Sequence, residues 1–248
     1  TSKNSDGKIT RIVLLSEEQA ENAWKLSANW PHLLLSSAQF YSNGEDVTLL
    51  HNGNPHFKFT VIPALASAPS SAVPLQSSAD DESGITFQAT LPDSSPKIAI
   101  QPTKQAGTVP PVSLGPPFSS SPHGVATAPN EEELALAAKW KLVIPSSDWR
   151  GVDNLFLEVH YNGDVAHLTS GTELLDDDFY NGSTWTVGLD RFREHIAKEG
   201  LELEILPRPV DAPIFLERRF RDHGSGQVLE LKSVQLIPQY QLKMRFAR

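Results

Sequence analysis

The chain has 248 residues, enough for one large β domain or two smaller ones. Its formal net charge is −9, and an acidic surface repels phosphate backbones and anionic headgroups, so we expect no nucleic-acid partner and no membrane partner. The chain contains no cysteine, which excludes disulfides, thiolate nucleophiles and cysteine-ligated metal sites.

Residues 1–64 are predicted to form a smaller β-rich segment with one short helix. Ser16 and Gln19 have the spacing of a capping box, which predicts a helix from Ser16 to Leu26 with Ala20, Ala23 and Trp24 facing inward. Alternating apolar residues predict strands at 8–15, 32–37, 39–51 and 56–63, with turns at Ser42-Asn43-Gly44 and at 52–55.

Residues 65–130 are rich in proline and serine and are predicted to be a loop or linker with two strands. The strand-like stretches are GITFQATLP and KIAIQP, between Gly84 and Pro102. The tract from 108 to 129 is open to two interpretations, a PxxP ligand or an extended loop around a β domain, and we favour the loop.

Residues 131–248 are predicted to form an antiparallel β-sandwich of the jelly-roll type, which makes the whole chain mostly β. Asn130 is expected to cap a helix over the Ala-rich residues 131–140. The pattern LFLEVHY places Leu155, Leu157, Val159 and Tyr161 on one face of a strand. Asn162-Gly163 is typical of a type I′ hairpin, and Ser170-Gly171 predicts the next one. Further strands, predicted at 183–189, 201–207, 212–220, 227–237 and 239–246, complete about eight strands at regular spacing.

The densest acidic cluster is Asp176, Asp177 and Asp178. Oxygen-rich loops suit Ca²⁺, but three adjacent side chains do not face one ion, so a solvated turn is preferred to a structural calcium site. We therefore predict no cofactor and no metal ligand here, with a structural calcium ion as the alternative.

Aromatic and amide side chains follow this cluster. Asp178, Tyr180, Asn181 and Trp185 are the candidate carbohydrate-binding residues, because stacking rings beside polar acceptors suit a sugar. The competing interpretation is that Phe179, Tyr180 and Trp185 only close the end of the sandwich core.

No residue is assigned a catalytic role, so the sequence leaves open whether the chain is an enzyme. A glycosidase needs two carboxylates, and no spacing singles out a pair among Glu158, Asp164, Glu173, Glu202 and Glu204. His160 and His167 are expected on consecutive hairpin strands, without an evident third metal ligand. Arg218, Arg219 and Arg221 form a basic patch that we interpret as a surface contact.

Several motifs of the final third occur in a familiar order: WKLVIPSSDW, DNLFLEVHYNGDVAHL, GTELLDDDFYNG, WTVGLDRF and LELEILP. From Trp140 onward the chain resembles the C-terminal jelly-roll, or galactose-binding-like, region of bacterial glycoside hydrolase family 35 β-galactosidase-type enzymes. The catalytic barrel of that family, about 300 residues with both catalytic glutamates, has no counterpart here.

The resemblance implies a non-catalytic accessory β-sandwich that supports a catalytic barrel domain or subunit and contacts carbohydrate. It also implies a bacterial protein that is periplasmic or secreted, with a cytoplasmic location as the alternative. Other functions left open are a free-standing carbohydrate-binding module and a subunit that docks on a separate catalytic chain.

Overall fold

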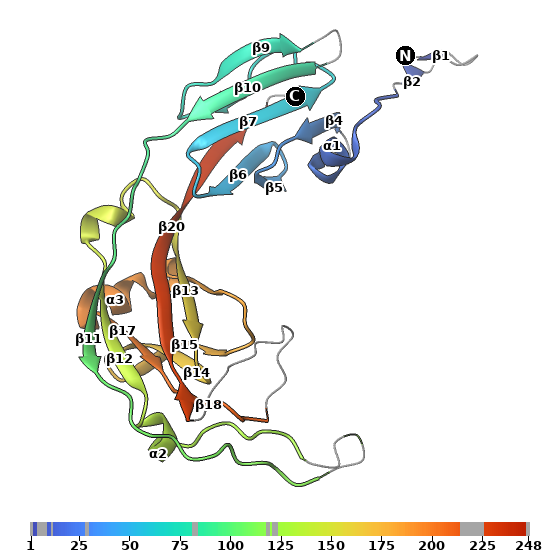
Figure 1. Cartoon of the computed structure of the whole chain (residues 1–248). Helices are drawn as coiled ribbons and strands as arrows, with labels where there is room; N and C mark the ends of the chain where they lie inside the picture. Colours follow the sequence, from blue (N-terminus) through green and yellow to red (C-terminus); the bar gives the residue numbers. More distant parts are fainter. Residues whose placement is uncertain are drawn as a thin grey trace. The chain divides into compact units, whose positions relative to one another are not determined.

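The fold is mostly β, with antiparallel sheets and a few short helices (Figure 1). The computed structural model describes residues 2–3, 9–10, 12–27, 30–80, 84–117, 120, 124–213 and 226–246. The chain divides into two compact units, one made of Thr1–Asp93 with Tyr240–Arg248 and the other of Ser94–Gln239. None of the described helices is both long enough and apolar enough to cross a membrane.

The first unit contains two main sheets. One sheet has the order β3-β4-β7-β10-β9. Its strands are β3 (Ala23–Ser27), β4 (Trp30–Leu35), β7 (His56–Ile62), β10 (Gly84–Thr90) and β9 (Gln76–Asp80). The other pairs β5 (Gln39–Asn43), β6 (Asp46–Asn52) and β8 (Ser70–Ser71) with the last residues of β20 (Glu230–Arg245). Two short strands, β1 (Ser2–Lys3) and β2 (Ile9–Thr10), pair with each other.

Aromatic side chains form the core of the first unit. In β7, Phe57, Phe59 and Val61 are buried at every second position, as the period of a strand requires. The ring of Phe59 stacks on that of Phe87 in the neighbouring β10, with centroids 5.2 Å apart. The predicted strands at 32–37, 39–51 and 56–63 are confirmed, and Gly44 makes the turn between β5 and β6 with a φ of 64°.

The helix predicted from Ser16 to Leu26 is wrong in its length. The capping box of Ser16 and Gln19 is present, but α1 (Glu17–Glu21) ends after five residues. Residues Ala23–Ser27 form β3 instead, because pairing with β4 satisfies their backbone and buries Leu26 while Trp24 stays 36% exposed. The strand predicted at 8–15 is also too long: β2 is two residues, and Leu14 is 91% exposed.

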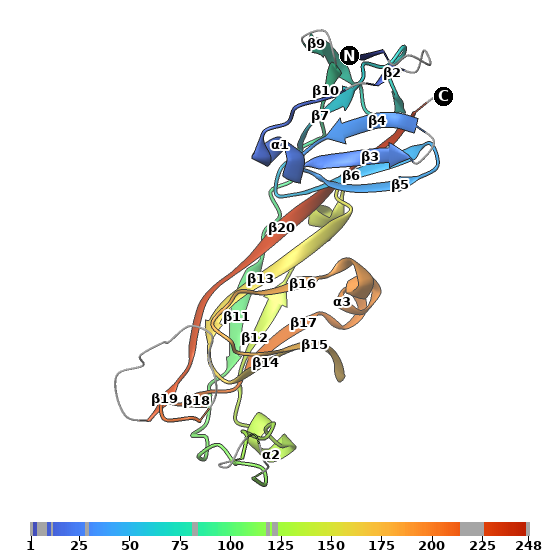
Figure 2. The ribbon, with the colours of Figure 1, turned by 90° about the vertical axis from the view of Figure 1, so that its right-hand side faces the viewer.

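The second unit is an antiparallel β-sandwich, which confirms the predicted fold class (Figure 2). One sheet has the order β11-β12-β17-β14-β15, and the other places β13 between β16 and β20. The strands are β11 (Ala99–Lys104), β12 (Ala138–Val143), β13 (Asn154–Asn162), β14 (Val165–Ser170), β15 (Glu173–Phe179), β16 (Trp185–Gly188) and β17 (Leu201–Ile205). The remaining elements are α2 (Glu131–Leu134), η1 (Ser146–Trp149), η2 (Asp190–Phe192), α3 (Arg193–Glu199) and the pair β18 (Arg208–Pro209) and β19 (Gln227–Val228).

The predicted apolar face of residues 155–161 is confirmed. Leu155, Leu157, Val159 and Tyr161 are all buried in the sandwich core. They share this core with residues of the opposite sheet, including Leu168 and Leu203. Each buried leucine contributes about 1.5–3 kcal/mol relative to exposure, so this face holds the two sheets together.

The type I′ hairpin predicted at Asn162-Gly163 is wrong. The strands on either side, β13 and β14, belong to different sheets, so the connection crosses from one layer of the sandwich to the other. Gly163 has no positive φ, which a type I′ turn requires. The glycine is needed for space, since a Cβ here would lie 2.8 Å from Cγ2 of Ile205. The hairpin predicted at Ser170-Gly171 is confirmed between β14 and β15.

Two further strand assignments differ from the prediction. The Ala-rich residues after Asn130 form only four helical residues, and Ala138–Val143 are β12, in which Lys139 and Lys141 lie opposite Glu204 and Glu202 of β17. Residues 227–246 were expected to hold two strands, but Glu230–Arg245 form one strand of 16 residues. The strand predicted at 212–220 lies mostly outside the described residues.

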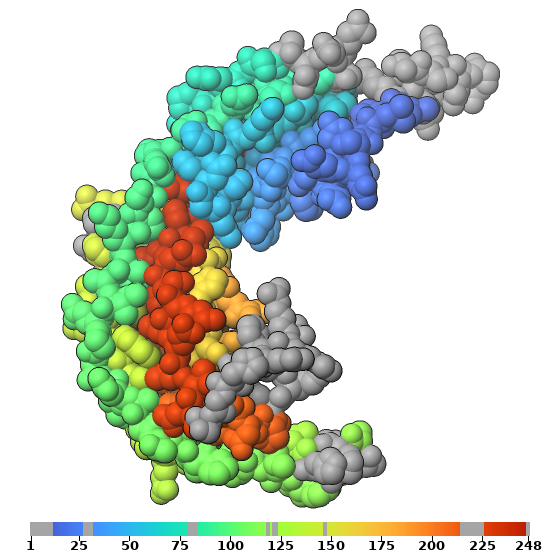
Figure 3. Space-filling view, viewed as in Figure 1, coloured from blue at the N-terminus to red at the C-terminus, as the bar shows by residue number. Residues whose placement is uncertain are grey.

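The proline-rich region does not form a separate part of the fold. Both predicted strands are present, but β10 belongs to the first unit and β11 to the second, so the unit boundary falls near residue 93 rather than at 64 and 130. After β11 the described residues up to 130 form no strand, apart from one bridge between Leu114 and Ala126. This extended segment, drawn green, forms part of the surface of the second unit (Figure 3).

Candidate sugar-binding pocket

The candidate carbohydrate-binding residues lie around one loop of the second unit. Asp178 is at the end of β15, Trp185 begins β16, and Tyr180 and Asn181 lie in the connection between them. These two strands belong to different sheets, so the loop closes one end of the sandwich. The structure therefore places the four residues close together along a short stretch of backbone.

The rings of the two candidate aromatic residues, Tyr180 and Trp185, are buried and not exposed to solvent. Tyr180 is 6% exposed and Trp185 is 7% exposed, and both belong to the sandwich core. The ring of Tyr180 is tilted against that of Tyr161 at 5.4 Å, and the guanidinium of Arg208 lies 6.0 Å from its centroid. The alternative interpretation, in which these rings close the core, describes Tyr180 and Trp185 well. Phe179 differs, since it is 54% exposed.

The three aspartates lie in a strand, so the solvated turn expected for them is wrong. All of them belong to β15, where successive side chains point to opposite faces of the sheet. Asp176 pairs with the guanidinium of Arg191 at 2.5 Å, and Asp178 accepts the hydroxyl of Tyr161 at 2.8 Å. Within the described part of the chain, no three His, Asp or Glu side chains are grouped so as to hold a metal ion.

A half-buried polar network lies beneath the loop. Burial raises the pKa of Asp178, and the hydrogen bond from Tyr161 opposes that rise. Burial also raises the pKa of the Tyr161 phenol, with the negative charge of Asp178 adding to the effect. Burial likewise raises the pKa of Asp164, against the influence of the positive Arg208. In this network, burial therefore disfavours the charged forms of Asp178 and Asp164, and the neighbouring Tyr161 and Arg208 stabilise those charged forms.

A pocket of about 330 Å³ opens beside this network. Small-ligand pockets generally have volumes of about 300–1,000 Å³, so this one is large enough for a single sugar ring. Its lining brings together residues of β13, the loop and β20: His160, Tyr161, Tyr180, Gly182, Ser183, Thr184 and Lys232. Six of these seven residues carry a side chain that donates or accepts a hydrogen bond.

The loop is held in a defined conformation at the pocket. Oδ1 of Asn181 accepts the backbone N–H of Ser183 at 2.8 Å, which makes an Asx turn, and Gly182 has a φ of 88°. The hydroxyl of Thr184 lies 3.2 Å from Nδ1 of His160. Asn181 thus acts on the shape of the pocket, whereas Ser183 and Thr184 supply hydroxyl groups to its lining.

Lys232 lines the pocket because β20 is irregular at this point. His160 is opposite Ser233 and Tyr161 is opposite Leu231, so Lys232 is an extra residue between them, as in a β-bulge. A bulge redirects a side chain out of the regular alternation. The sequence gives no signal of this irregularity, and His160 and Lys232 were not among the predicted sugar-binding residues. His160 and His167 lie in different sheets, contrary to the expectation of a shared hairpin.

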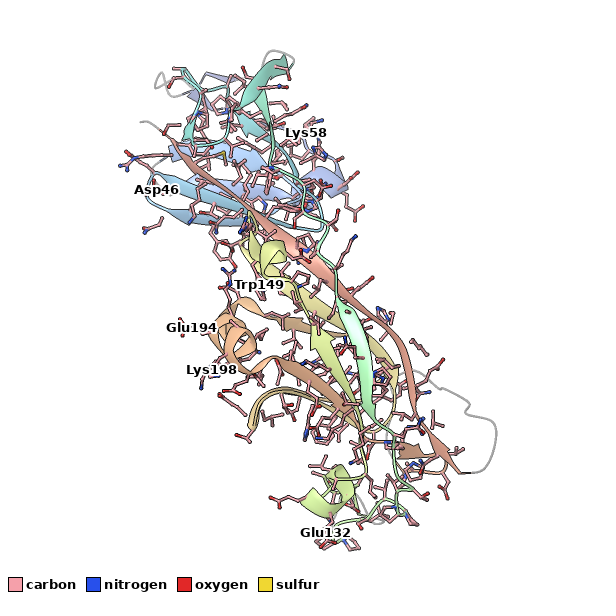
Figure 4. All side chains as sticks on the ribbon, turned by 90° about the vertical axis from the view of Figure 1, so that its left-hand side faces the viewer. Asp46, Lys58, Glu132, Trp149, Glu194 and Lys198 are labelled. Carbon is pink, nitrogen blue, oxygen red and sulfur yellow. The ribbon has the colours of Figure 1, made fainter. Side chains whose placement is uncertain are left out.

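A second, more open hollow of about 460 Å³ lies next to α3. Here Nδ1 of His195 lies 2.9 Å from a carboxylate oxygen of Glu173, and both side chains are about half exposed. Glu194 and Lys198 are carried on α3 and directed away from the strands (Figure 4). The hydroxyl of Ser170 donates to the carbonyls of His195 and Gly200, so its role is to attach α3 to β14.

The other candidate carboxylates make contacts within the sheets. Glu158 accepts the side-chain amide of Gln235 at 2.8 Å, across paired strands. Glu202 and Glu204 both bond to the ammonium group of Lys139, whose pKa is raised chiefly by the hydrogen bond to Glu204. The patch of Arg218, Arg219 and Arg221 lies outside the described residues.

No family model, curated protein or solved structure matches this chain.

Proposed function

We propose that this chain is a non-catalytic β-sandwich region of a β-galactosidase-like glycoside hydrolase, which supports the catalytic barrel and contacts carbohydrate. The observation that carries the proposal is the pocket at the Tyr180–Thr184 loop. Sugar rings present hydroxyl groups in several directions, and the hydroxyls, imidazole and ammonium group of this lining offer matching donors and acceptors. The loop also lies in the stretch of sequence that resembles the galactose-binding-like region.

A supporting role without catalysis agrees with the contacts that several of the candidate carboxylates make within the fold. Glycoside hydrolysis needs two of them on opposite sides of the bond, about 5–9.5 Å apart. Glu158, Glu202 and Glu204 instead hold neighbouring strands together through Gln235 and Lys139. Asp178 is bound by Tyr161 below the pocket and is not part of its lining.

Calorimetry on the purified chain tests the contact with carbohydrate. Titration with methyl β-galactoside and with its uronate analogue is expected to give saturable heat for at least one of them. His160→Ala is expected to weaken that binding, since it removes a pocket side chain. The matched control is His167→Ala, on the other sheet, which should bind as the unchanged chain does. The absence of heat with both sugars would contradict the proposal.

Hydrolysis of an aryl β-galactoside tests the non-catalytic part of the proposal. The chain alone is expected to show no turnover. Turnover that is abolished by a single carboxylate substitution would overturn it. Co-purification with a catalytic chain would instead support the form of the proposal in which this chain is a separate docking subunit.

A location outside the cytoplasm fits the same function. The resemblance to the family 35 region implies such a location, so we propose that the protein is periplasmic or secreted. Fractionation of the producing cells checks this, and recovery in the cytoplasmic fraction would contradict it.

A further inference from the structure

We infer that the pocket at the Tyr180–Thr184 loop prefers an acidic sugar, a uronate, to the corresponding neutral sugar. The inference rests on the proposed contact with carbohydrate and concerns its specificity. It follows from the charges that line the pocket, the way in which the fold positions them, and the contacts that the nearby carboxylates make.

The described lining of the pocket is positively charged, in contrast to the negative net charge of the chain. The chain carries a net charge of −9, yet the described side chains that line this pocket include Lys232 and no carboxylate. Its other polar groups are neutral hydroxyls and the imidazole of His160. A carboxylate on a bound sugar would find an ammonium partner here and no acidic side chain in the described lining.

The bulge in β20 makes this charge part of the built pocket. With His160 opposite Ser233 and Tyr161 opposite Leu231, Lys232 is the residue that the ladder leaves over. In a regular ladder, successive side chains of β20 would alternate between the two faces of the sheet, and Lys232 would lie on the opposite face from Ser233. The extra residue changes that alternation, and Lys232 lines the pocket beside His160 and Tyr161.

The carboxylates near the lining are directed to other partners. Asp178 accepts the hydroxyl of Tyr161 at 2.8 Å, so it is attached to the network beneath the loop. Glu230 lies 3.9 Å from the ammonium group of Lys232, at the outer limit of an ion pair, and both side chains are about half exposed. An exposed pair at that distance is weak, so a ligand carboxylate can displace it.

The experiment compares methyl β-galactoside, methyl β-galacturonide and acetate by calorimetry at low salt. The galacturonide is expected to bind about fivefold more tightly than the galactoside, the upper end for an exposed ion pair, and added salt should reduce the ratio. Lys232→Gln should remove the preference, which is measured as the ratio of the two affinities. Lys58→Gln, in the first unit, makes the same change in net charge and should keep the preference.

Each other result has a distinct meaning. Equal affinity for the two sugars, or a preference that survives Lys232→Gln, would overturn the inference and leave the proposed function standing. Acetate binding as tightly as the galacturonide would also overturn it, because the site would then recognise a simple anion. If neither sugar binds, the proposed function fails, and the inference fails with it.

Discussion

Replacing Tyr161 by phenylalanine tests the network beneath the pocket. The phenol donates to a carboxylate oxygen of Asp178 at 2.8 Å and lies 3.1 Å from the backbone carbonyl of the same residue. The ring contact with Tyr180, at 5.4 Å, would be kept by phenylalanine. The change therefore removes one hydrogen-bond donor and little else.

The magnitude follows from the kind of bond that is lost. A hydrogen bond to a charged group contributes about 1.5–3 kcal/mol, and water can partly replace the donor at a half-exposed carboxylate, so we expect a loss of about 1–2 kcal/mol at neutral pH. The loss should depend on pH. The pKa of Asp178 in the folded state is already above its ordinary value of 3.8, and the bond from Tyr161 is what limits the rise.

A folded-state pKa above the unfolded value means that the charged form lowers stability, so stability falls as the pH rises from 3.8 through the folded-state pKa. Without the phenol this pKa rises further, and the variant loses more stability over the same interval. The deficit of Tyr161→Phe should therefore be full at pH 7 and should shrink as the pH falls below the folded-state pKa of Asp178.

Urea unfolding followed by tryptophan fluorescence, at pH 7 and near pH 4, measures both effects. The matched control is Tyr41→Phe, at a tyrosine of β5 that is 60% exposed, and its stability should stay within about 0.5 kcal/mol of the original. A Tyr161→Phe variant as stable as the original chain at pH 7 would refute the reasoning, and so would a deficit of the same size at both pH values.

Two other substitutions probe the sandwich itself. Trp185→Ala should cost about 3–5 kcal/mol of stability, as large-to-small changes in a core do, and a loss below about 1 kcal/mol in urea unfolding would show that the ring is not a core residue. Gly163→Ala should cost about 1–3 kcal/mol, because the new Cβ would lie 2.8 Å from Cγ2 of Ile205 and 2.9 Å from the carbonyl of Leu206. Gly115→Ala is its control, since the nearest atom to a Cβ there is 3.6 Å away, and equal melting temperatures for the two variants would contradict the steric argument.

The sequence predicts those parts of the fold that depend on local periodicity. The alternation from Leu155 to Tyr161 appears directly in the chain, and so do the capping box at Ser16 and the helix cap at Asn130. Which strand pairs with which depends on distant residues. Asn162-Gly163 has the composition of a hairpin, yet the next strand joins the other sheet. The Ala-rich pattern predicts a helix up to residue 140, yet Ala138–Val143 pair with β17, which places their two lysines opposite Glu202 and Glu204.

In the candidate site, too, some features are indicated by the local sequence and others depend on how distant strands pack. The loop from Tyr180 to Thr184 could be singled out from its turn residues and aromatic rings, and the structure places a pocket beside it. The burial of Tyr180 and Trp185 depends on how the two sheets close over them, which composition does not show. Lys232 enters the lining through a bulge that exists only once β13 and β20 are paired, so no pattern within residues 227–246 indicates it.

The long strand β20 has a consequence for the order in which the protein can fold during synthesis. Its last residues, Tyr240, Leu242 and Met244, are core residues of the unit that otherwise consists of the first 93 residues. The core of that unit can therefore be completed only after the whole of the second unit has been synthesised. The sandwich between residues 94 and 239 can complete its core first, although domains usually fold from the N-terminus onward. Until translation reaches residue 246, the strands between residues 23 and 90 lack part of the core against which they pack.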